Sequence, residues 1–301
     1  MDTISVIIPA YNVNGYLHEA CESVLSQTFN DWECIIVDDG STDGTFSVAE
    51  QYCQRDARFR AIRQENAGVA IARNVGLSQA CGPFVVFLDA DDVLEPTAFE
   101  CWVNALLAAP ECVLAWGSAI RFEDKTNIVK EIPWKNYLAT GCAWHDMLVH
   151  DFLPVGTFCL RRSALPVGCQ FNPLFTHAED RDFLLRVLRG NCIVYANRQV
   201  LRFRLRGDSA SSDFQAAIEN ELNVMQMHLA DPDVPSKIRR RARSALAFRC
   251  AVVAAFTGRQ YAKACGWYLK AILIDPLNVN LFLLPLRKCA MALREKLRNI
   301  S

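Results

Sequence analysis

The stretch Phe84-Val85-Val86-Phe87-Leu88-Asp89-Ala90-Asp91-Asp92 decides how this chain folds. Five consecutive apolar residues that end at polar ones are typical of a strand buried on both faces of a parallel sheet. Side chains at positions i and i+2 of an extended chain point the same way, so Asp89 and Asp91 present two carboxylates on one side of the strand end. Such oxygens suit Mg²⁺ or Mn²⁺ bound together with substrate phosphates. An isolated pair of this kind is more often a solvated loop cap.

The same alternation extends outward from this strand in both directions. Helical patterns separate further apolar runs, and this predicts an α/β fold with a doubly wound, mostly parallel sheet. Ligands bind such sheets beyond the carboxyl ends of the strands, where the carboxylates follow Leu88. The other strands predicted near the start of the chain are Ile4–Ile8, Cys34–Val37, Phe59–Ile62 and Val113–Trp116, and the helices include residues 42–53 and 68–79. Two later strands are predicted at Ile193–Ala196 and Val200–Arg204.

Net charge divides the chain of 301 residues into two parts. Residues 1–214 contain 18 Lys and Arg against 27 Asp and Glu, whereas residues 215–301 contain 14 against 6, so the overall charge of −1 is a cancellation. The later part has helical patterns at 215–229, 236–257, 260–273 and 279–299. We therefore expect a first domain over 1–214 and a basic helical C-terminal region over 215–301.

Composition excludes several classes of protein. A hydrophobic fraction of 51% rules out a disordered chain. We expect no signal peptide, because the first residues have no basic segment, and no membrane-spanning helix, because no apolar stretch is long enough. The thirteen cysteines show no C-x-x-C spacing, so we expect reduced cytosolic thiols rather than a zinc site.

Three more segments contain residue types suited to chemistry. Residues 38–45, Asp-Asp-Gly-Ser-Thr-Asp-Gly-Thr, end a strand, and a carboxylate there can accept hydrogen bonds from a nucleobase or ribose. Arg73 lies on a small-residue helix from which it can reach a diphosphate. Glu179-Asp180 begins a helix, whose N-terminus favours an ionised carboxylate suited to a general base. Taken singly, each has a plain alternative: a capped turn, a surface arginine, or an ordinary acidic helix start.

Together and in this order, the segments resemble the inverting glycosyltransferases of family 2, which have the GT-A fold. Val6-Ile7-Ile8-Pro9-Ala10-Tyr11-Asn12 is similar to the opening strand and nucleotide loop of that family. The later matches are residues 38–45, 66–77, 87–92 and 179–180, and the resemblance spans about residues 3–211.

The resemblance implies a role for each matched residue. Pro9, Tyr11 and Asp39 are expected around the base of a nucleotide, usually uridine, with Arg73 near the nucleotide. Asp89 is expected at the ribose or the metal. Asp91 is expected to coordinate Mg²⁺ or Mn²⁺ on the diphosphate, and Asp180 to act as catalytic base.

One position departs from the family pattern. Many relatives have histidine where Arg206 stands in Arg204-Leu205-Arg206-Gly207-Asp208-Ser209, and that histidine can serve as a further metal ligand. Arginine cannot bind a metal, so two expectations stay open: Arg206 holds the pyrophosphate directly, or this segment moves on binding.

The function expected from the resemblance is metal-dependent transfer of a sugar from a nucleotide-diphosphate donor, a UDP-sugar, to the hydroxyl of a glycan or a lipid-linked acceptor. The expected setting is surface polysaccharide or glycolipid synthesis at the cytoplasmic side of the membrane. Two alternatives are an inactive nucleotide-sugar binder and a sugar nucleotidyltransferase. The second is disfavoured because Pro9-Ala10-Tyr11-Asn12 is not a glycine-rich phosphate loop.

The C-terminal region has three interpretations. Residues 258–278 loosely resemble one tetratricopeptide-type hairpin, which would have to pack on neighbours. The basic side chains of residues 237–243, with a second basic and leucine-rich pattern over 286–300, could dock on anionic lipid. The third interpretation is a helical appendage with a solvated basic face. Nucleic acid is not expected as a partner, because no recognition motif accompanies the charge.

Overall fold

The computed structural model describes residues 3–123, 130–131, 140–150, 152–206, 214–256 and 261–276. It divides into two compact units, one of Met1–Met147 with Asp151–Ser211 and one of Leu148–His150 with Ser212–Ser301.

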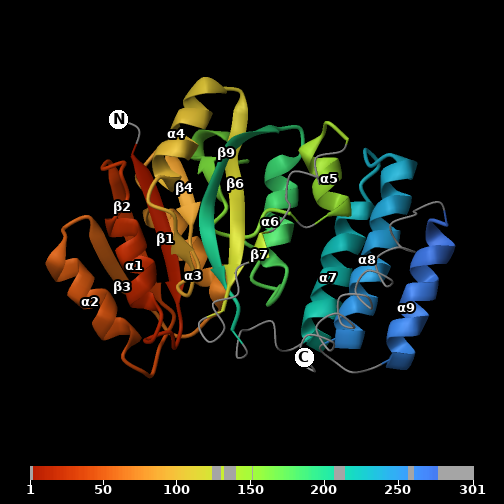
Figure 1. Cartoon of the computed structure of the whole chain (residues 1–301), viewed down its shortest axis with the longest axis horizontal. Coiled ribbons are helices and arrows are strands. Elements are labelled where there is room, and N and C mark those ends of the chain that lie inside the picture. Colours follow the sequence, from red (N-terminus) through yellow and green to blue (C-terminus); the bar gives the residue numbers. More distant parts are fainter. Residues whose placement is uncertain are drawn as a thin grey trace, which may run out of the picture. The chain divides into compact units, whose positions relative to one another are not determined.

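The first unit is built on a single mixed sheet (Figure 1). Within the described residues its strands are β1 (Ile4–Ala10), β2 (Trp32–Asp38), β3 (Phe59–Arg63), β4 (Phe84–Phe87), β5 (Val93–Leu94), β6 (Cys112–Phe122), β7 (Lys130–Glu131), β8 (Phe158–Arg161) and β9 (Cys192–Arg204). The order is β3-β2-β1-β4-β8-β6-β9-β5, and β7 pairs with β6 beside this path. β1 pairs in parallel with β2 and β4, β2 with β3, and β6 with β9, whereas β5, β7 and β8 run antiparallel to their partners. The predicted mostly parallel sheet is confirmed.

Helices cover both faces of this sheet. Their bounds are α1 (Leu17–Leu25), α2 (Thr45–Arg55), α3 (Val69–Gln79), α4 (Ala98–Ala108), α5 (Ala143–Val149) and α6 (Glu179–Leu188). Alternate β1 side chains, Ile4, Val6 and Ile8, join an apolar core with residues of α1, α2 and α4. Ile7 points to the other face and meets α3, because strand side chains alternate.

Helix α3 approaches β1 closely because position 76 is glycine. A Cβ added at Gly76 would collide with Cγ2 of Ile7. This close approach brings Arg73, one helical turn earlier in α3, down toward the ends of the central strands.

The structure differs from the sequence prediction in two strands. The predicted strand Val113–Trp116 is part of the longer β6, and the predicted strands 193–196 and 200–204 form one continuous β9. Between them Asn197 adopts a φ of 51°, and the pairing register with β6 shifts there. The polar residues around Asn197 therefore form a local irregularity within one continuous strand, and not a loop between two strands.

The second unit is helical in its described part. It contains α7 (Phe214–Leu229), α8 (Ser236–Phe256) and α9 (Tyr261–Ile274), at the positions of three predicted helices. Ala247 and Ala271 lie at the centre of its α8–α9 packing, and the Ser244 hydroxyl donates to the Ala271 carbonyl at 2.9 Å. The fourth predicted helix, 279–299, lies outside the described residues. Among the described helices, none combines the length and the apolar character that a bilayer crossing requires.

Candidate active site

The candidate site lies at the carboxyl ends of β1, β2 and β4. These three strands are neighbours and run parallel, so their carboxyl ends lie side by side at the same end of the sheet. Asp39 directly follows β2, and Asp89 lies two residues after β4. The topology thus brings together carboxylates that are fifty residues apart in the sequence.

Asp39 organises the loop that leads into α3. Its side chain is 3% exposed, and its Oδ1 accepts hydrogen bonds from Gln64 Nε2 at 2.7 Å and from the Ala67 amide at 2.9 Å. Its Oδ2 accepts one bond, from the Gly68 amide at 2.8 Å. Gly68 has a φ of 92°, in the left-handed region that favours glycine. Because a carboxylate oxygen can accept two bonds, Oδ2 keeps one acceptor position beyond the Gly68 bond.

The loop after β1 presents an aromatic ring to solvent. Pro9 is buried inside β1, opposite Val37, whereas the Tyr11 side chain is 50% exposed. Asn12 fixes this loop to the one after β2: its amide donates to Ser41 Oγ at 3.0 Å, and its Oδ1 accepts from the Thr42 amide at 2.9 Å. Of the predicted base-contacting residues in this loop, only Tyr11 therefore offers an exposed side chain.

Arg73 joins the strand-end carboxylates to helix α6. It is 3% exposed, and it donates to Asp89 Oδ1 at 2.8 Å and to Glu179 Oε1 at 2.7 Å. Burial opposes its charge, but Asp89 and Glu179 more than offset that cost and raise the pKa of Arg73. Its guanidinium also lies over the Phe171 ring, 5.3 Å from the centroid. The structure places Arg73 as a buried bridge rather than as a surface arginine.

Asp91 contacts the residue that departs from the family pattern. Arg206 Nη1 lies 3.1 Å from Asp91 Oδ2, and its guanidinium lies 4.4 Å from the centre of the Tyr16 ring. Burial and the neighbouring Asp89 raise the pKa of Asp91, while Arg206 acts in the opposite direction. A cation at this place is therefore favourable for Asp91.

Asp92 and Arg204 form a buried support that the sequence did not reveal. Asp92 is 1% exposed and accepts from the Arg204 amide at 2.8 Å, and burial raises its pKa well above the usual range. The Arg204 side chain donates to the Asp91 carbonyl and to Glu19 Oε2, both at 2.8 Å. Glu19 and Arg204 are far apart in the chain, so no local pattern signals this pair.

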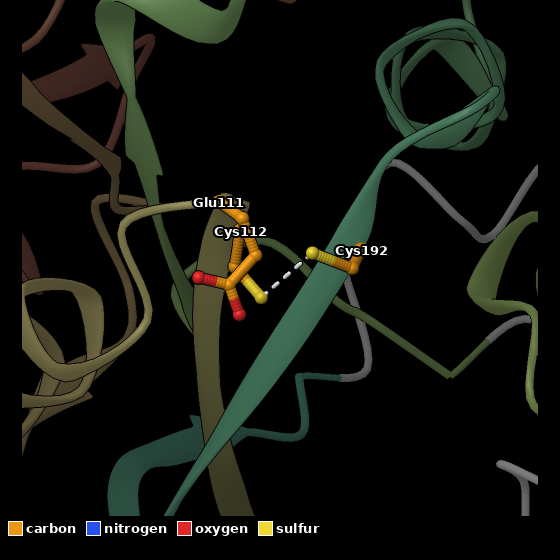
Figure 2. A group of neighbouring side chains, drawn as sticks. All are labelled: Glu111, Cys112 and Cys192. Carbon is orange, nitrogen blue, oxygen red and sulfur yellow. Dashed lines mark hydrogen bonds between the residues drawn. The ribbon is translucent and has the colours of Figure 1, made fainter.

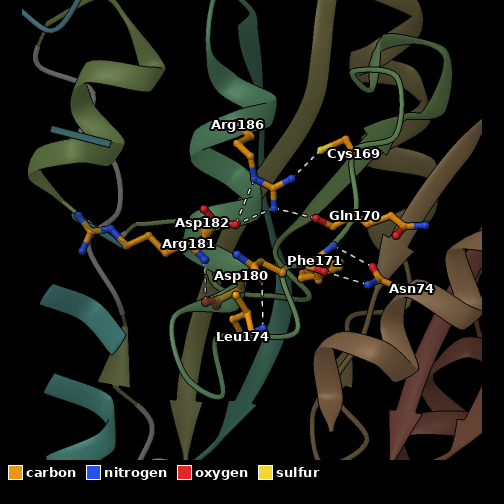
Figure 3. A network of polar contacts seen from close by, with 10 residues as sticks. Asn74, Cys169, Gln170, Phe171, Leu174, Asp180, Arg181, Asp182 and Arg186 are labelled. Carbon is orange, nitrogen blue, oxygen red and sulfur yellow. Dashed lines mark hydrogen bonds and ion pairs between the residues drawn. The ribbon is translucent and has the colours of Figure 1, made fainter. Parts of the chain in front are cut away.

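Asp180 lies in the first turn of α6 (Figure 3). Ala178, the residue before the helix, has a φ of 60°, and Asp180 Oδ1 accepts from the Arg181 amide at 2.7 Å. Its acidic neighbours are buried and engaged: Glu179 with Arg73, and Asp182 with Arg186 at 2.6 Å. Of the three acids in this turn, Asp180 is the one with a partly exposed side chain. That is the position in which a carboxylate can meet a substrate.

The network around Asp180 also ties α6 to α3. Asn74 and Phe171 exchange two hydrogen bonds of 2.8 Å, one from the Asn74 amide group to the Phe171 carbonyl and one from the Phe171 amide to Asn74 Oδ1 (Figure 3). Phe171 stacks on Phe183 of α6, with 4.2 Å between ring centroids. Arg73 and Asn74 of α3 therefore both fix the start of α6.

The carboxylates fit a divalent cation. Asp89 and Asp91 each use one oxygen for an arginine, and no other described residue donates a hydrogen bond to the second oxygen of either. Proteins usually bind Mg²⁺ or Mn²⁺ through one or two carboxylates, while substrate phosphates supply further oxygen ligands. The second oxygens of Asp89 and Asp91 match that number of protein ligands.

Comparisons with known proteins find relatives of this chain both in sequence and in fold. The model of the family described as glycosyl transferase family 2 matches residues 5–165. A putative teichuronic acid biosynthesis glycosyltransferase, TuaG of Bacillus subtilis, is 38% identical over 212 residues, which cover 70% of this chain and 82% of TuaG. The matches to glycosyltransferase GlyA of Streptococcus pneumoniae and to EpsJ of B. subtilis cover only 14% and 28% of those relatives.

Two solved structures have the same fold. S. aureus TarS 1-349 in complex with UDP-GlcNAc superposes with a TM-score of 0.66 at 20% identity, covering 91% of this chain and 83% of TarS 1-349. The mannosyltransferase PcManGT of Pyrobaculum calidifontis, in complex with GDP-Man and Mn²⁺, superposes with a TM-score of 0.65 at 19% identity, covering 98% of this chain and 82% of PcManGT. The predicted GT-A fold with helices following it is confirmed.

Proposed function

Since the chain belongs to glycosyl transferase family 2, we propose that it is a metal-dependent, inverting transferase that moves a sugar from a UDP-sugar to an acceptor hydroxyl. The observation that carries this proposal is the double contact of Arg73. One buried guanidinium joins Asp89, beside the proposed donor site, to Glu179, the neighbour of the proposed base Asp180. The transfer of a sugar needs a metal-binding group on the side of the leaving diphosphate and a base on the side of the acceptor. Arg73 connects Asp89 on the first side with Glu179, the neighbour of the proposed base, on the second.

In the proposed reaction Asp180 takes the proton of the acceptor hydroxyl as that oxygen attacks the anomeric carbon. Asp180 lies in the first turn of α6, and a helix N-terminus favours negative charge there, which suits a group that accepts a proton. A Mg²⁺ or Mn²⁺ ion held by Asp91 with Asp89 would supply positive charge at the leaving diphosphate. Attack from the side opposite to that diphosphate inverts the anomeric centre in one step.

The nucleotide is proposed to bind at the loops after β1 and β2. The exposed Tyr11 ring offers a stacking surface, and the remaining acceptor position of Asp39 Oδ2 can receive one N–H of a base. The solved complexes of TarS with UDP and UDP-GlcNAc support a uridine nucleotide, while PcManGT with GDP-Man and Mn²⁺ supports a divalent metal. The TuaG relative supports a role in surface polysaccharide or glycolipid synthesis.

The test is a screen of nucleotide sugars for Mn²⁺-dependent hydrolysis or transfer by the wild type and by Asp180→Asn. Loss of a general base lowers the rate by roughly 10²–10⁴-fold. We expect that loss with unchanged binding of UDP, measured by calorimetry. Glu50→Gln, an exposed change on α2, is the matched control and keeps full activity.

Each other outcome of the screen decides between functions. Near-normal turnover by Asp180→Asn removes this residue from the role of base. Tight UDP binding by a wild type that neither hydrolyses nor transfers any sugar identifies a binding protein. Formation of a nucleotide sugar from a sugar phosphate identifies a nucleotidyltransferase.

We further propose that the second unit docks on anionic lipid at the cytoplasmic face of the membrane, where a lipid-linked acceptor would be available. The basic α8 surface consists of Lys237, Arg240, Arg241 and Arg243, which are all exposed. Arg240 lies 3.5 Å from Asp275, which follows α9, so the start of α8 lies beside the end of that helix. Leu273, near that end, is 82% exposed. The four exposed cations of α8 attract an anionic bilayer surface, and an exposed leucine elsewhere in this unit offers apolar area to the same bilayer.

Liposome flotation tests the docking proposal with the full chain. Each Lys or Arg near an anionic surface contributes about 1 kcal/mol, so the triple variant Lys237→Gln, Arg241→Gln, Arg243→Gln should bind phosphatidylglycerol vesicles more than tenfold less well. The control removes three exposed arginines from the first unit: Arg162→Gln, Arg198→Gln, Arg202→Gln. Equal loss in both variants, or binding to uncharged vesicles alone, would contradict the proposal.

A further inference from the structure

Two cysteines that are 80 positions apart meet at the amino ends of their strands, whereas the candidate active site lies at the carboxyl ends of the parallel strands. Cys112 begins β6 and Cys192 begins β9, and the two residues are register partners in this parallel pair. Both strands run in the same direction as β4. Their first residues therefore lie at the amino ends of the strands, whereas Asp89 follows the carboxyl end of β4. This place is therefore separate from the network of Arg73 and Asp91.

The two thiols are in direct contact, and a carboxylate lies beside them (Figure 2). The Sγ atoms are 2.9 Å apart, and the ligand atoms of Glu111, Cys112 and Cys192 all lie within 4.8 Å of one another. Figure 2 shows the Glu111 carboxylate next to the Cys112 side chain, whose sulfur faces Cys192. Among the described residues this is the one group of three such side chains gathered closely enough to hold a metal.

The donor set has the chemistry of a zinc site. Thiolate sulfur and carboxylate oxygen are both zinc ligands, with Zn–S distances of about 2.3 Å and Zn–O distances of about 2.0–2.2 Å. Two sulfurs on one tetrahedral ion lie about 3.8 Å apart, as follows from that Zn–S distance and the tetrahedral angle. The present contact must therefore open by roughly 0.9 Å, which a small rotation of one cysteine side chain provides.

Exposure makes this adjustment and the entry of an ion feasible. Cys112 is 5% exposed and is fixed in the ladder between β6 and its neighbours, whereas Cys192 and Glu111 are exposed. One rigid ligand and two adjustable ones can close around an ion that arrives from solvent. A disulfide between the same sulfurs would make no use of Glu111.

We propose that Glu111, Cys112 and Cys192 form a binding site for one Zn²⁺ ion, with water as the fourth ligand. Binding replaces the two thiol protons, which are released to solvent, and leaves the carboxylate as the third protein ligand. The bound ion ties the start of β6 to the start of β9. The proposed donor site, which uses only oxygen ligands, differs from this one in its preference for hard cations.

The experiment uses the full chain, reduced and freed of metal with a chelator, and Co²⁺ as a spectroscopic substitute for Zn²⁺. Coordination by thiolates gives Co²⁺ a sulfur-to-metal charge-transfer band that an all-oxygen site cannot give. We expect one such ion per chain, displaced by Zn²⁺. Cys192→Ser should abolish the band, and Glu111→Gln should weaken Zn²⁺ binding by at least about tenfold, as even indirect partners of a metal contribute that much.

Two matched controls keep the result specific. Cys81→Ser removes another exposed cysteine of the first unit, and Asp91→Asn removes the proposed hard-metal ligand; both should keep the band. Bound Zn²⁺ should also protect Cys192 from alkylation by iodoacetamide in the wild type. No band in the wild type, an unchanged band in Cys192→Ser, or formation of a Cys112–Cys192 disulfide without uptake of metal by the reduced chain would overturn the proposal.

Discussion

The charged side chains of the sheet edge in the first unit and those of α8 in the second are arranged in opposite ways. At the carboxyl ends of the strands the arginines are buried and paired. Arg73 donates hydrogen bonds to two carboxylates, and Arg204 donates one to Glu19. On α8, Lys237, Arg241 and Arg243 are exposed and pair with no described residue. Paired buried charges fix geometry, whereas unpaired exposed charges remain available to a partner. The comparison therefore separates the part built for chemistry from the part proposed for docking.

The largest expected effect breaks the pairing at the sheet edge. Arg73→Met leaves Asp89 and Glu179 without their shared cation, and removing one partner of a buried pair costs about 3–5 kcal/mol of stability. We expect urea unfolding, followed by circular dichroism, to show this loss. Arg73→Lys should recover part of it, because one ammonium keeps the charge but cannot reach both carboxylates as a guanidinium does.

The matched control for that prediction comes from the other region. Arg241→Met on α8 removes an exposed arginine and should change stability by less than about 0.5 kcal/mol. Equal losses in Arg73→Met and Arg241→Met would remove the contrast between the two regions.

A smaller effect is expected where an arginine and a metal share one carboxylate. Arg206→Ala removes the positive charge that lies 3.1 Å from Asp91, so the affinity of Asp91 for Mn²⁺ should rise, by about tenfold for one close charge near the surface. Calorimetric titration of Mn²⁺ without nucleotide measures this. Arg202→Ala, an exposed arginine earlier in β9, is the control and should leave the affinity unchanged. Weaker Mn²⁺ binding by Arg206→Ala would show that Arg206 supports the metal site rather than competing with the ion.

The smallest effect concerns a paired carboxylate far from the site. Partial burial works against the charge of Glu33, but hydrogen bonds from Ser5 and the Cys81 amide, with the charge of Arg60, lower its pKa below 4.5. A lowered pKa contributes stability that is present above the unfolded value and is lost as the pH falls through the folded one. Glu33→Gln should therefore cost about 1 kcal/mol at pH 7, and this cost should shrink below about pH 4.5. Denaturant midpoints at several pH values measure it.

Glu65→Gln is the control for that pH dependence, because Glu65 is exposed and has no described partner. Its stability should follow that of the wild type at every pH. A cost of Glu33→Gln that is constant from pH 3 to pH 7 would point to packing rather than to the charge of Glu33.

The sequence predicted what depends on local pattern. The apolar run before Asp89 identified a buried strand, and the order of the matched segments identified the fold. The position of Asp180 in the first helical turn followed from the pattern at Glu179-Asp180. The strand and the start of the helix are each encoded within a few residues of one another, which is why periodicity and spacing were sufficient to predict them. The GT-A fold, in contrast, followed from the resemblance of the ordered segments to a known family.

The pairings between distant residues could not be predicted in this way. Arg73 was expected near the nucleotide, and its bond to Glu179, 106 positions later, depends on how α3 and α6 pack. The thiol pair of Cys112 and Cys192 shows the same limit, since a search for C-x-x-C spacing detects only ligands close in sequence. Strand register, a tertiary property, brought these two residues together.

Gly76 gives the closeness of α3 to β1 a consequence for evolution. A single added methyl group at this position would lift the helix from Ile7 and carry Arg73 away from both of its carboxylates. The side chains that position 76 tolerates are thus limited by the need to keep Arg73 in place. Gly76 touches no substrate, yet it is as constrained as the acidic residues that Arg73 contacts. Variation among descendants of this chain should be as scarce at Gly76 as at Asp89.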